Sequence, residues 1–168
     1  LGLTNLTILD RAIKLIKERQ DIDLLLNEIP LDDVPTFDML GEAETFGVFQ
    51  LESDGMRRYV KELKPTSIAD ISAMIALYRP GPMEHIPRFI ESKHGRREIT
   101  YPHEDLKPIL EETYGVIVYQ DQVLLIAREF GGYTLGEADM LRKSMGKKAP
   151  EIMAAERENF VGGAREKG

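Results

Sequence analysis

Apolar side chains recur at intervals of three and four residues along most of the chain, the spacing that puts them on one face of an α-helix. In residues 4–20 this face carries Leu6, Leu9, Ile13 and Ile16, with basic residues outside it. Capping residues, prolines and glycines divide the rest of the pattern into shorter helices. We expect these at residues 36–40, 53–63, 67–78, 86–93, 103–112, 122–130, 134–145 and from 150 to about 162–163, where order is lost.

Two short apolar runs interrupt this helical periodicity. GVFQL at 47–51 and GVIVY at 115–119 contain β-branched and aromatic residues and no charge, which is typical of short strands. The expected fold class is therefore mostly α with a few short β-strands. No internal repeat or long linker breaks the chain.

Composition narrows the possible chemistry. The chain has no cysteine, which excludes disulfides and thiolate metal sites and fits a reducing, cytoplasmic setting. No apolar run approaches the roughly 18 residues of a membrane span, so no membrane contact is expected. The three histidines lie far apart and lack carboxylates at ligand spacing, so no metal site is assigned to them: His85, His94 and His103.

The net charge of −7 is unevenly distributed along the chain. Residues 21–55 hold ten acids and no Lys or Arg, whereas residues 55–103 carry nine bases against five acids. An acidic total therefore does not exclude an anionic partner, because local patches set the field that a ligand meets.

The densest basic cluster is LRKSMGKK at 141–148, with Arg142, Lys143, Lys147 and Lys148 in eight positions. A helix C-terminus favours nearby cations by about 0.3–1 kcal/mol each, which accounts for one or two of them. Four such charges repel one another, and a bound anion would relieve that repulsion. A triphosphate or a nucleic-acid backbone suits a mixed Arg and Lys cluster.

Two further segments have both a structural and a functional interpretation. Arg79 begins the rigid turn RPGP at 79–82, from which it either reaches a ligand or is simply exposed. The amides of YQDQ at 119–122 either contact a base or sugar, or cap the following helix. Because no Walker loop, GxGxxG, GxSxG or HExxH motif occurs, no catalytic residue and no metal ligand is assigned.

Seven ordered blocks cover nearly the whole chain: LGL…LTI (1–8), TFGVFQLES (45–53), ALYRPGP (76–82), KHGRREITYPHEDLKPIL (93–110), TYGVIVYQDQV (113–123), GYTLGEADMLRKSMGKK (132–148) and FVGGA (160–164). Together they resemble the alpha subunit of bacterial replicative DNA polymerase III, a C-family DNA polymerase, and specifically its helical fingers domain. The resemblance implies that residues 1–20 are the end of the palm and the entry helix. Residues 21–168 are then a fingers domain that is incomplete at its C-terminal end.

The family's activity is DNA-directed DNA synthesis by two-metal nucleotidyl transfer. Its palm binds Mg2+ through three aspartates, the third in a D-F-L-G-L sequence, and this chain begins at L-G-L. The resemblance therefore implies that the aspartates lie outside this chain. We expect the chain to be a fragment that is inactive alone.

The resemblance also assigns roles to the basic cluster. The family's L-R-R-A-M-G-K-K segment holds the incoming triphosphate through adjacent arginines, which match Arg142 and Lys143 here. Lys at the second position keeps the charge but loses the bidentate fork of arginine. Lys147 and Arg79 are expected to bind dNTP phosphates too, and Lys148 to contact DNA.

The implied partners are primer-template DNA, dNTP and other replicase subunits, namely the sliding clamp, the clamp loader and the proofreading subunit. Two alternatives remain open. The chain is either a catalytically inactive helical nucleic-acid-binding module, or a protein-interaction module whose acidic residues 21–55 bind a basic partner.

Overall fold

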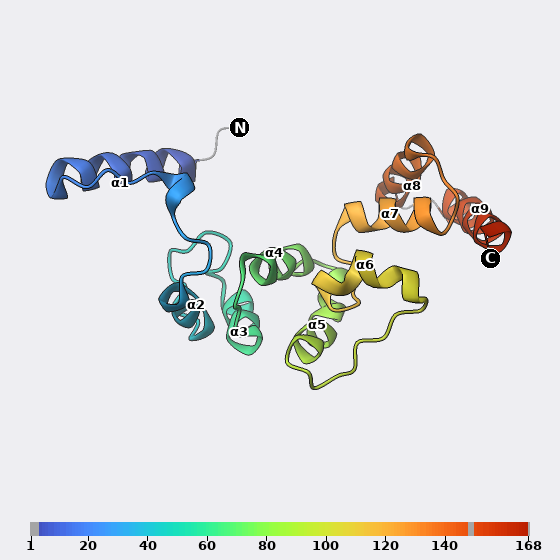
Figure 1. The fold of residues 1–168 in the computed structure, drawn as a ribbon, viewed down its shortest axis with the longest axis horizontal. Coiled ribbons are helices and arrows are strands. Elements are labelled where there is room, and N and C mark those ends of the chain that lie inside the picture. The colour runs from blue at the N-terminus through green and yellow to red at the C-terminus, as the bar shows by residue number, and fades with distance from the viewer. Residues whose placement is uncertain (1–3, 148–149, 168) are drawn as a thin grey trace. The chain divides into compact units, whose positions relative to one another are not determined.

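A computed structural model describes residues 4–147 and 150–167, apart from the side chains at 147, 150 and 152. The described part is helical (Figure 1). Its α-helices are α1 Thr4–Gln20, α2 Val34–Gly41, α3 Asp54–Leu63, α4 Ile68–Leu77, α5 Ile86–Lys93, α6 Lys107–Leu110, α7 Gln120–Glu129, α8 Leu135–Lys147 and α9 Pro150–Lys167. Short 3-10 helices are η1 Leu26–Glu28, η2 Pro82–His85, η3 Glu104–Leu106 and η4 Glu111–Thr113.

The chain divides into two compact units, unit 1 at Leu1–Ile71 and unit 2 at Ser72–Gly168. In unit 1, α2 packs against α3, and the buried side chains include Leu40, Val60 and Leu63. In unit 2, the fully buried side chains of α4 and α5 include Met74, Leu77, Ile86 and Phe89.

The mostly helical fold was predicted correctly, but the strand expected at 47–51 is wrong. This segment is a series of turns in which Thr45 Oγ1 donates a hydrogen bond to the Leu51 carbonyl over 2.7 Å. Gly47 and Gln50 have φ angles of 76° and 65°, in the left-handed region that an extended strand cannot use. Apolar residues alone therefore did not produce a strand here.

The strand expected at 115–119 is also wrong. Tyr114 and Gly115 adopt φ angles of 52° and 78°, so the chain reverses where the strand was expected to begin. Thr113 Oγ1 then donates to the carbonyl of Val116 over 2.6 Å. Backbone groups that a neighbouring strand would have bonded are satisfied by turn and side-chain contacts instead.

Two of the predicted helix starts are confirmed by their caps. Ser53 accepts a hydrogen bond from the backbone N–H of Met56 over 3.3 Å at the start of α3. Before α8, the Glu137 carboxylate accepts from the Thr134 backbone N–H over 2.8 Å, and Thr134 Oγ1 accepts from the Glu137 N–H over 3.4 Å. This reciprocal pair is the capping box that the spacing indicated.

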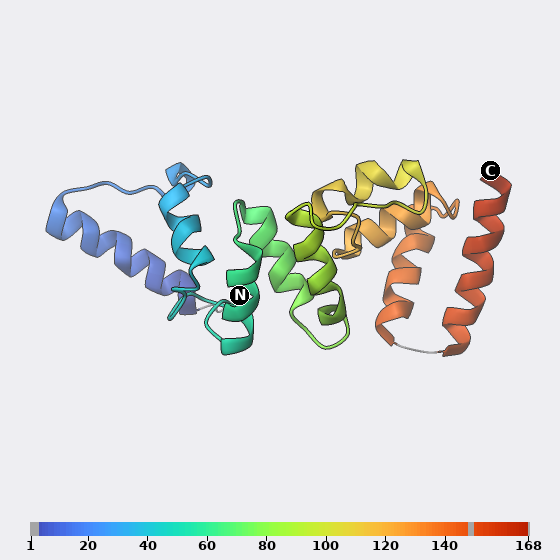
Figure 2. The same cartoon turned by 90° about the horizontal axis from the view of Figure 1, so that it is seen from below.

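Helix α9 differs from the sequence prediction, because it continues beyond residues 162–163 to Lys167. It lies beside α8 and antiparallel to it in unit 2 (Figure 2). Gly163 approaches the end of α7 so closely that a Cβ there would overlap the carbonyl oxygen of Gly131. Glycine at 163 therefore permits close packing, and this packing keeps the helix intact.

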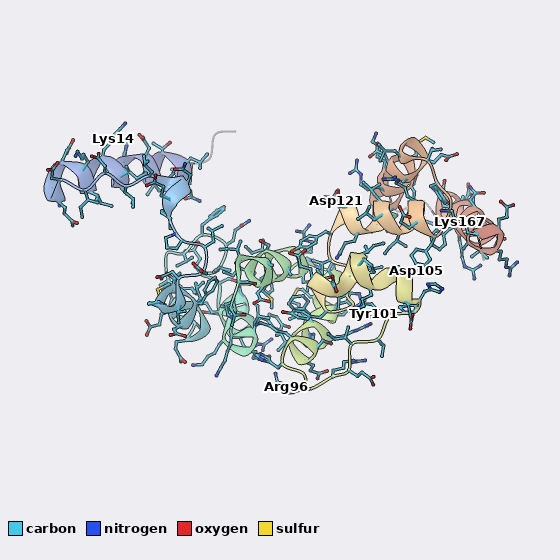
Figure 3. All side chains as sticks on the ribbon, in the orientation of Figure 1. Lys14, Arg96, Tyr101, Asp105, Asp121 and Lys167 are labelled. Atoms are coloured by element: carbon cyan, nitrogen blue, oxygen red, sulfur yellow. The ribbon has the colours of Figure 1, made fainter. Side chains whose placement is uncertain are left out.

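Two polar contacts secure α9 further. The Tyr133 hydroxyl donates to the Glu156 carboxylate over 2.9 Å, and burial together with this carboxylate raises the pKa of Tyr133 to about 12. Lys167, labelled in Figure 3, donates to the carbonyls of Arg128 and Glu129 over 3.0 Å each. The ammonium thereby satisfies carbonyls at the C-terminal end of α7.

Among the helices that the structure describes, none is both long enough and apolar enough to cross a membrane.

We predict that Gly163→Ala lowers the free energy of unfolding of unit 2 by roughly 1–3 kcal/mol, because the new methyl group overlaps the Gly131 backbone. Gly162→Ala is the matched control, since no atom lies within 4 Å of a Cβ built there. This control should be neutral or stabilise the helix by up to about 1 kcal/mol. Urea unfolding of both variants measures the difference, and equal midpoints would contradict the packing argument.

Candidate functional site

The candidate site lies where α8 packs against α7. Ala127 of α7 and Ala138 and Leu141 of α8 form a buried apolar cluster, and the partly buried Leu124 and Tyr133 pack against it. Because two members are alanines, the helix backbones can approach closely. This contact fixes the position of the turn of α8 that comes just before Arg142.

Gln122 determines how α7 begins. Its side-chain oxygen accepts hydrogen bonds from the backbone N–H groups of Val118 and Tyr119, over 2.8 and 3.0 Å. Its amide nitrogen donates to the Ile109 carbonyl over 3.1 Å and to Thr113 Oγ1 over 2.8 Å. All four bonds are internal and the side chain is buried, so Gln122 has the capping role and not the ligand-binding one.

Arg142 is held by side chains from both helices. Its Nε and Nη2 donate to Asp139 Oδ1 over 3.1 and 2.7 Å, and its Nη1 donates to Gln120 Oε1 over 3.1 Å. A guanidinium has five N–H groups. Within the described residues three are used, which leaves two for a ligand, and the side chain remains 31% exposed.

Lys143 shares the same carboxylate. Its Nζ lies 2.7 Å from Asp139 Oδ2, and its side chain is 62% exposed. The hydrogen bonds from Lys143 and then from Arg142 hold the pKa of Asp139 below its ordinary value. The carboxylate is therefore ionised at neutral pH, and the three groups together carry one net positive charge.

Neither Asp139 nor Gln120 was predicted to hold Arg142. Asp139 stands three and four positions before Arg142 and Lys143, the spacing of ion pairs on a helix, so the sequence did contain this signal. Gln120 is separated from Arg142 by 22 positions and belongs to a different helix. No local pattern connects them.

Of the other predicted site residues, only Arg79 has a side chain that the structure describes. The side chain of Lys147, the last residue of α8, and the whole of Lys148 lie outside the described residues. Arg79 is exposed in the turn between α4 and η2.

The resemblance implies Mg2+, so the question for the described residues is whether any side chains could bind a metal ion. The described residues contain no group of three or more His, Asp or Glu side chains that could hold a metal ion. Asp139 instead pairs with two cations, and His103 Nδ1 accepts from the backbone N–H of Asp105 over 3.3 Å. The described residues therefore do not fit a metal.

Chemically, the site offers exposed cationic N–H donors on a helix and a carboxylate that is already paired. Such a group can bind and orient an anion with several oxygens, such as a phosphate chain. Asp139 pairs with two cations, so its carboxylate is not free to act as a general base.

Residues 5–168 match the family model of the bacterial DNA polymerase III alpha subunit finger domain. The chain therefore belongs to this family, and the resemblance seen in its sequence blocks is confirmed. It is 52% identical to the DNA polymerase III subunit alpha of Thermus aquaticus, 52% identical to that of Bacillus subtilis (strain 168) and 50% identical to that of Escherichia coli (strain K12). These matches cover 99–100% of the chain but only 14–15% of each relative.

We predict that the two glutamines at the start of α7 differ in their effect on stability. Gln122→Ala leaves three partly buried backbone groups without these bonds and should lower the free energy of unfolding by roughly 1–3 kcal/mol. Gln120→Ala, at an exposed position of the same helix, should change it by less than about 0.5 kcal/mol. Thermal unfolding followed by circular dichroism tests this, and equal losses would remove the capping role from Gln122.

Proposed function

We propose that the chain forms the part of a bacterial DNA polymerase III alpha subunit that binds the triphosphate of the incoming dNTP. The observation that carries this proposal is the Arg142 guanidinium, which is held from both α7 and α8 yet keeps two N–H groups for a ligand. Beside it, Lys143 contributes a second, more exposed cation.

The chemistry of nucleotide transfer suits such a group. Negative charge moves onto the leaving pyrophosphate as the new bond forms, and fixed positive groups stabilise that charge without having to reorganise. Arg142 supplies directed donors for two oxygens, and Lys143 supplies a point charge. The site also orients the nucleotide before reaction.

The remaining assignments extend this role. Lys147 and Arg79 add charge for the dNTP phosphates, and Lys148 contacts the DNA backbone. Residues 1–20 form the end of the palm and the entry helix, and residues 21–168 belong to the fingers. The alpha subunit that contains them acts on primer-template DNA and works with the sliding clamp, clamp loader and proofreading subunit.

Because the described residues do not fit a metal, the Mg2+ of the reaction belongs to aspartates in other parts of the alpha subunit. The role of this chain is then to bind and position the substrate. We do not expect it to extend a primer on its own.

A second candidate function, protein binding by unit 1, is favoured by its exposed apolar side chains within an acidic segment. An apolar hollow of about 370 Å³ is lined partly by Leu31, Phe37, Leu40 and Ile71. Leu31 is 72% exposed. The absence of Lys and Arg from residues 21–55 would favour a basic protein over DNA.

We predict that Arg142→Ala in a full-length alpha subunit lowers kcat/KM for dNTP by a factor corresponding to roughly 1.5–3 kcal/mol, the range for charge-assisted hydrogen bonds. Primer extension across a dNTP titration measures it. Primer-template affinity should hardly change, and Lys148→Ala should have the smaller effect on kcat/KM. An unaltered kcat/KM for Arg142→Ala would remove the triphosphate from this site.

For unit 1, we predict that the double substitution Asp32→Asn and Asp38→Asn weakens binding of a replicase partner about tenfold or more without changing kcat/KM for dNTP. Asp33 is left intact because its carboxylate accepts from the Thr36 N–H over 2.9 Å and caps α2. Titration of the alpha subunit with the sliding clamp, clamp loader and proofreading subunit tests this. Unchanged affinity for all three would argue against the second function.

A further inference from the structure

The orientation of Arg142 depends on two neighbours to which the proposed function gives no role of their own. Asp139 lies one turn earlier on α8, and Gln120 is the first residue of α7. An arginine side chain is long and flexible, so an exposed one ordinarily samples many rotamers. Here one acceptor on each helix restricts it.

We propose that Asp139 and Gln120 are positioning residues that hold the Arg142 guanidinium in the orientation in which it binds the nucleotide triphosphate. This inference rests on the proposed function. It adds the two residues through which the arginine acts.

The pattern of hydrogen bonds supports this role. Asp139 Oδ1 takes the Nε–H and one N–H of Nη2, and Gln120 Oε1 takes one N–H of Nη1. The two N–H groups that remain are one on Nη1 and one on Nη2. One N–H on each of these two nitrogens is therefore available to phosphate oxygens.

Asp139 also keeps two cations beside each other. Its Oδ1 accepts from Arg142 while its Oδ2 pairs with Lys143, both over 2.7 Å. Without the carboxylate, these adjacent cations repel each other and their side chains separate. A phosphate chain that spans Arg142 and Lys143 would then find the two side chains in many different relative positions.

A purely electrostatic role for Asp139 predicts the opposite result. A carboxylate near the site repels phosphate, so removing its charge should tighten nucleotide binding. Positioning predicts weaker binding, because Asn cannot hold two cations. The direction of the change in KM therefore separates the two roles.

The experiment uses a full-length alpha subunit in primer extension with a dNTP titration. Asp139→Asn preserves side-chain shape and removes the charge, and Gln120→Ala removes the second acceptor at an exposed position. Asp121→Asn is the matched control (Figure 3). It removes an equal charge next to Gln120 and touches none of the hydrogen bonds to Arg142. Circular dichroism checks that each variant is folded.

We expect Asp139→Asn to raise the KM for dNTP about tenfold and Gln120→Ala about threefold, with smaller changes in kcat. Asp121→Asn should leave the KM unchanged or lower it. In an Arg142→Ala background Gln120→Ala should cause no further loss, because Gln120 acts through that arginine. Asp139→Asn should cause a smaller loss there than in the unmodified protein, since only its pair with Lys143 is left to lose.

A KM for Asp139→Asn that falls or matches the Asp121→Asn control overturns the inference, as does an additive loss in the Arg142→Ala background. If Asp139→Asn does not fold, the Gln120→Ala variant and its double mutant decide by the same criteria. When Arg142→Ala lowers kcat/KM but these variants do not, only the positioning role fails. When Arg142→Ala has no effect, the proposed triphosphate site fails with it.

Discussion

The close contact of α7 and α8 is the constraint on which the candidate site depends. Ala127 and Ala138 are almost fully buried, at 1% and 0% exposure, and their small size lets the two helices approach. Only because the helices are this close can Gln120 at the start of one bind Arg142 near the end of the other. A larger residue at either alanine would separate the helices and free the arginine.

Electrostatics explains how α8 can hold a dense set of cations while it remains helical. Asp139 compensates Arg142 and Lys143 at the same time, so the part of the cluster that the structure describes is less repulsive than its sequence suggests. The compensation is partial, and exposed donors remain on both cations. A stable helix and an anion-binding surface are therefore compatible in one segment.

Local signals in the sequence predicted most of this fold, because helix periodicity and caps such as Ser53 act within a few residues. The apolar run at 115–119 did not form a strand, since a strand also needs a partner, and no other strand lies within the described residues. The end of α9 was misjudged for a related reason. Gly163 weakens an isolated helix, yet its contact with Gly131 is a tertiary one that composition does not reveal.

The candidate site shows the same division between local and distant information. Its cations were visible in the sequence, and the spacing of Asp139 would have identified their carboxylate partner. The contact with Gln120 could be known only from the packing of α7 against α8. This contact fixes the direction of the Arg142 donors within the basic cluster. Charge alone would attract any polyanion. An arginine whose orientation is fixed by hydrogen bonds to its neighbours favours an anion whose oxygens match its free N–H groups. Specificity for a phosphate chain, in the proposed function, therefore comes from the neighbours of the charge more than from the charge itself.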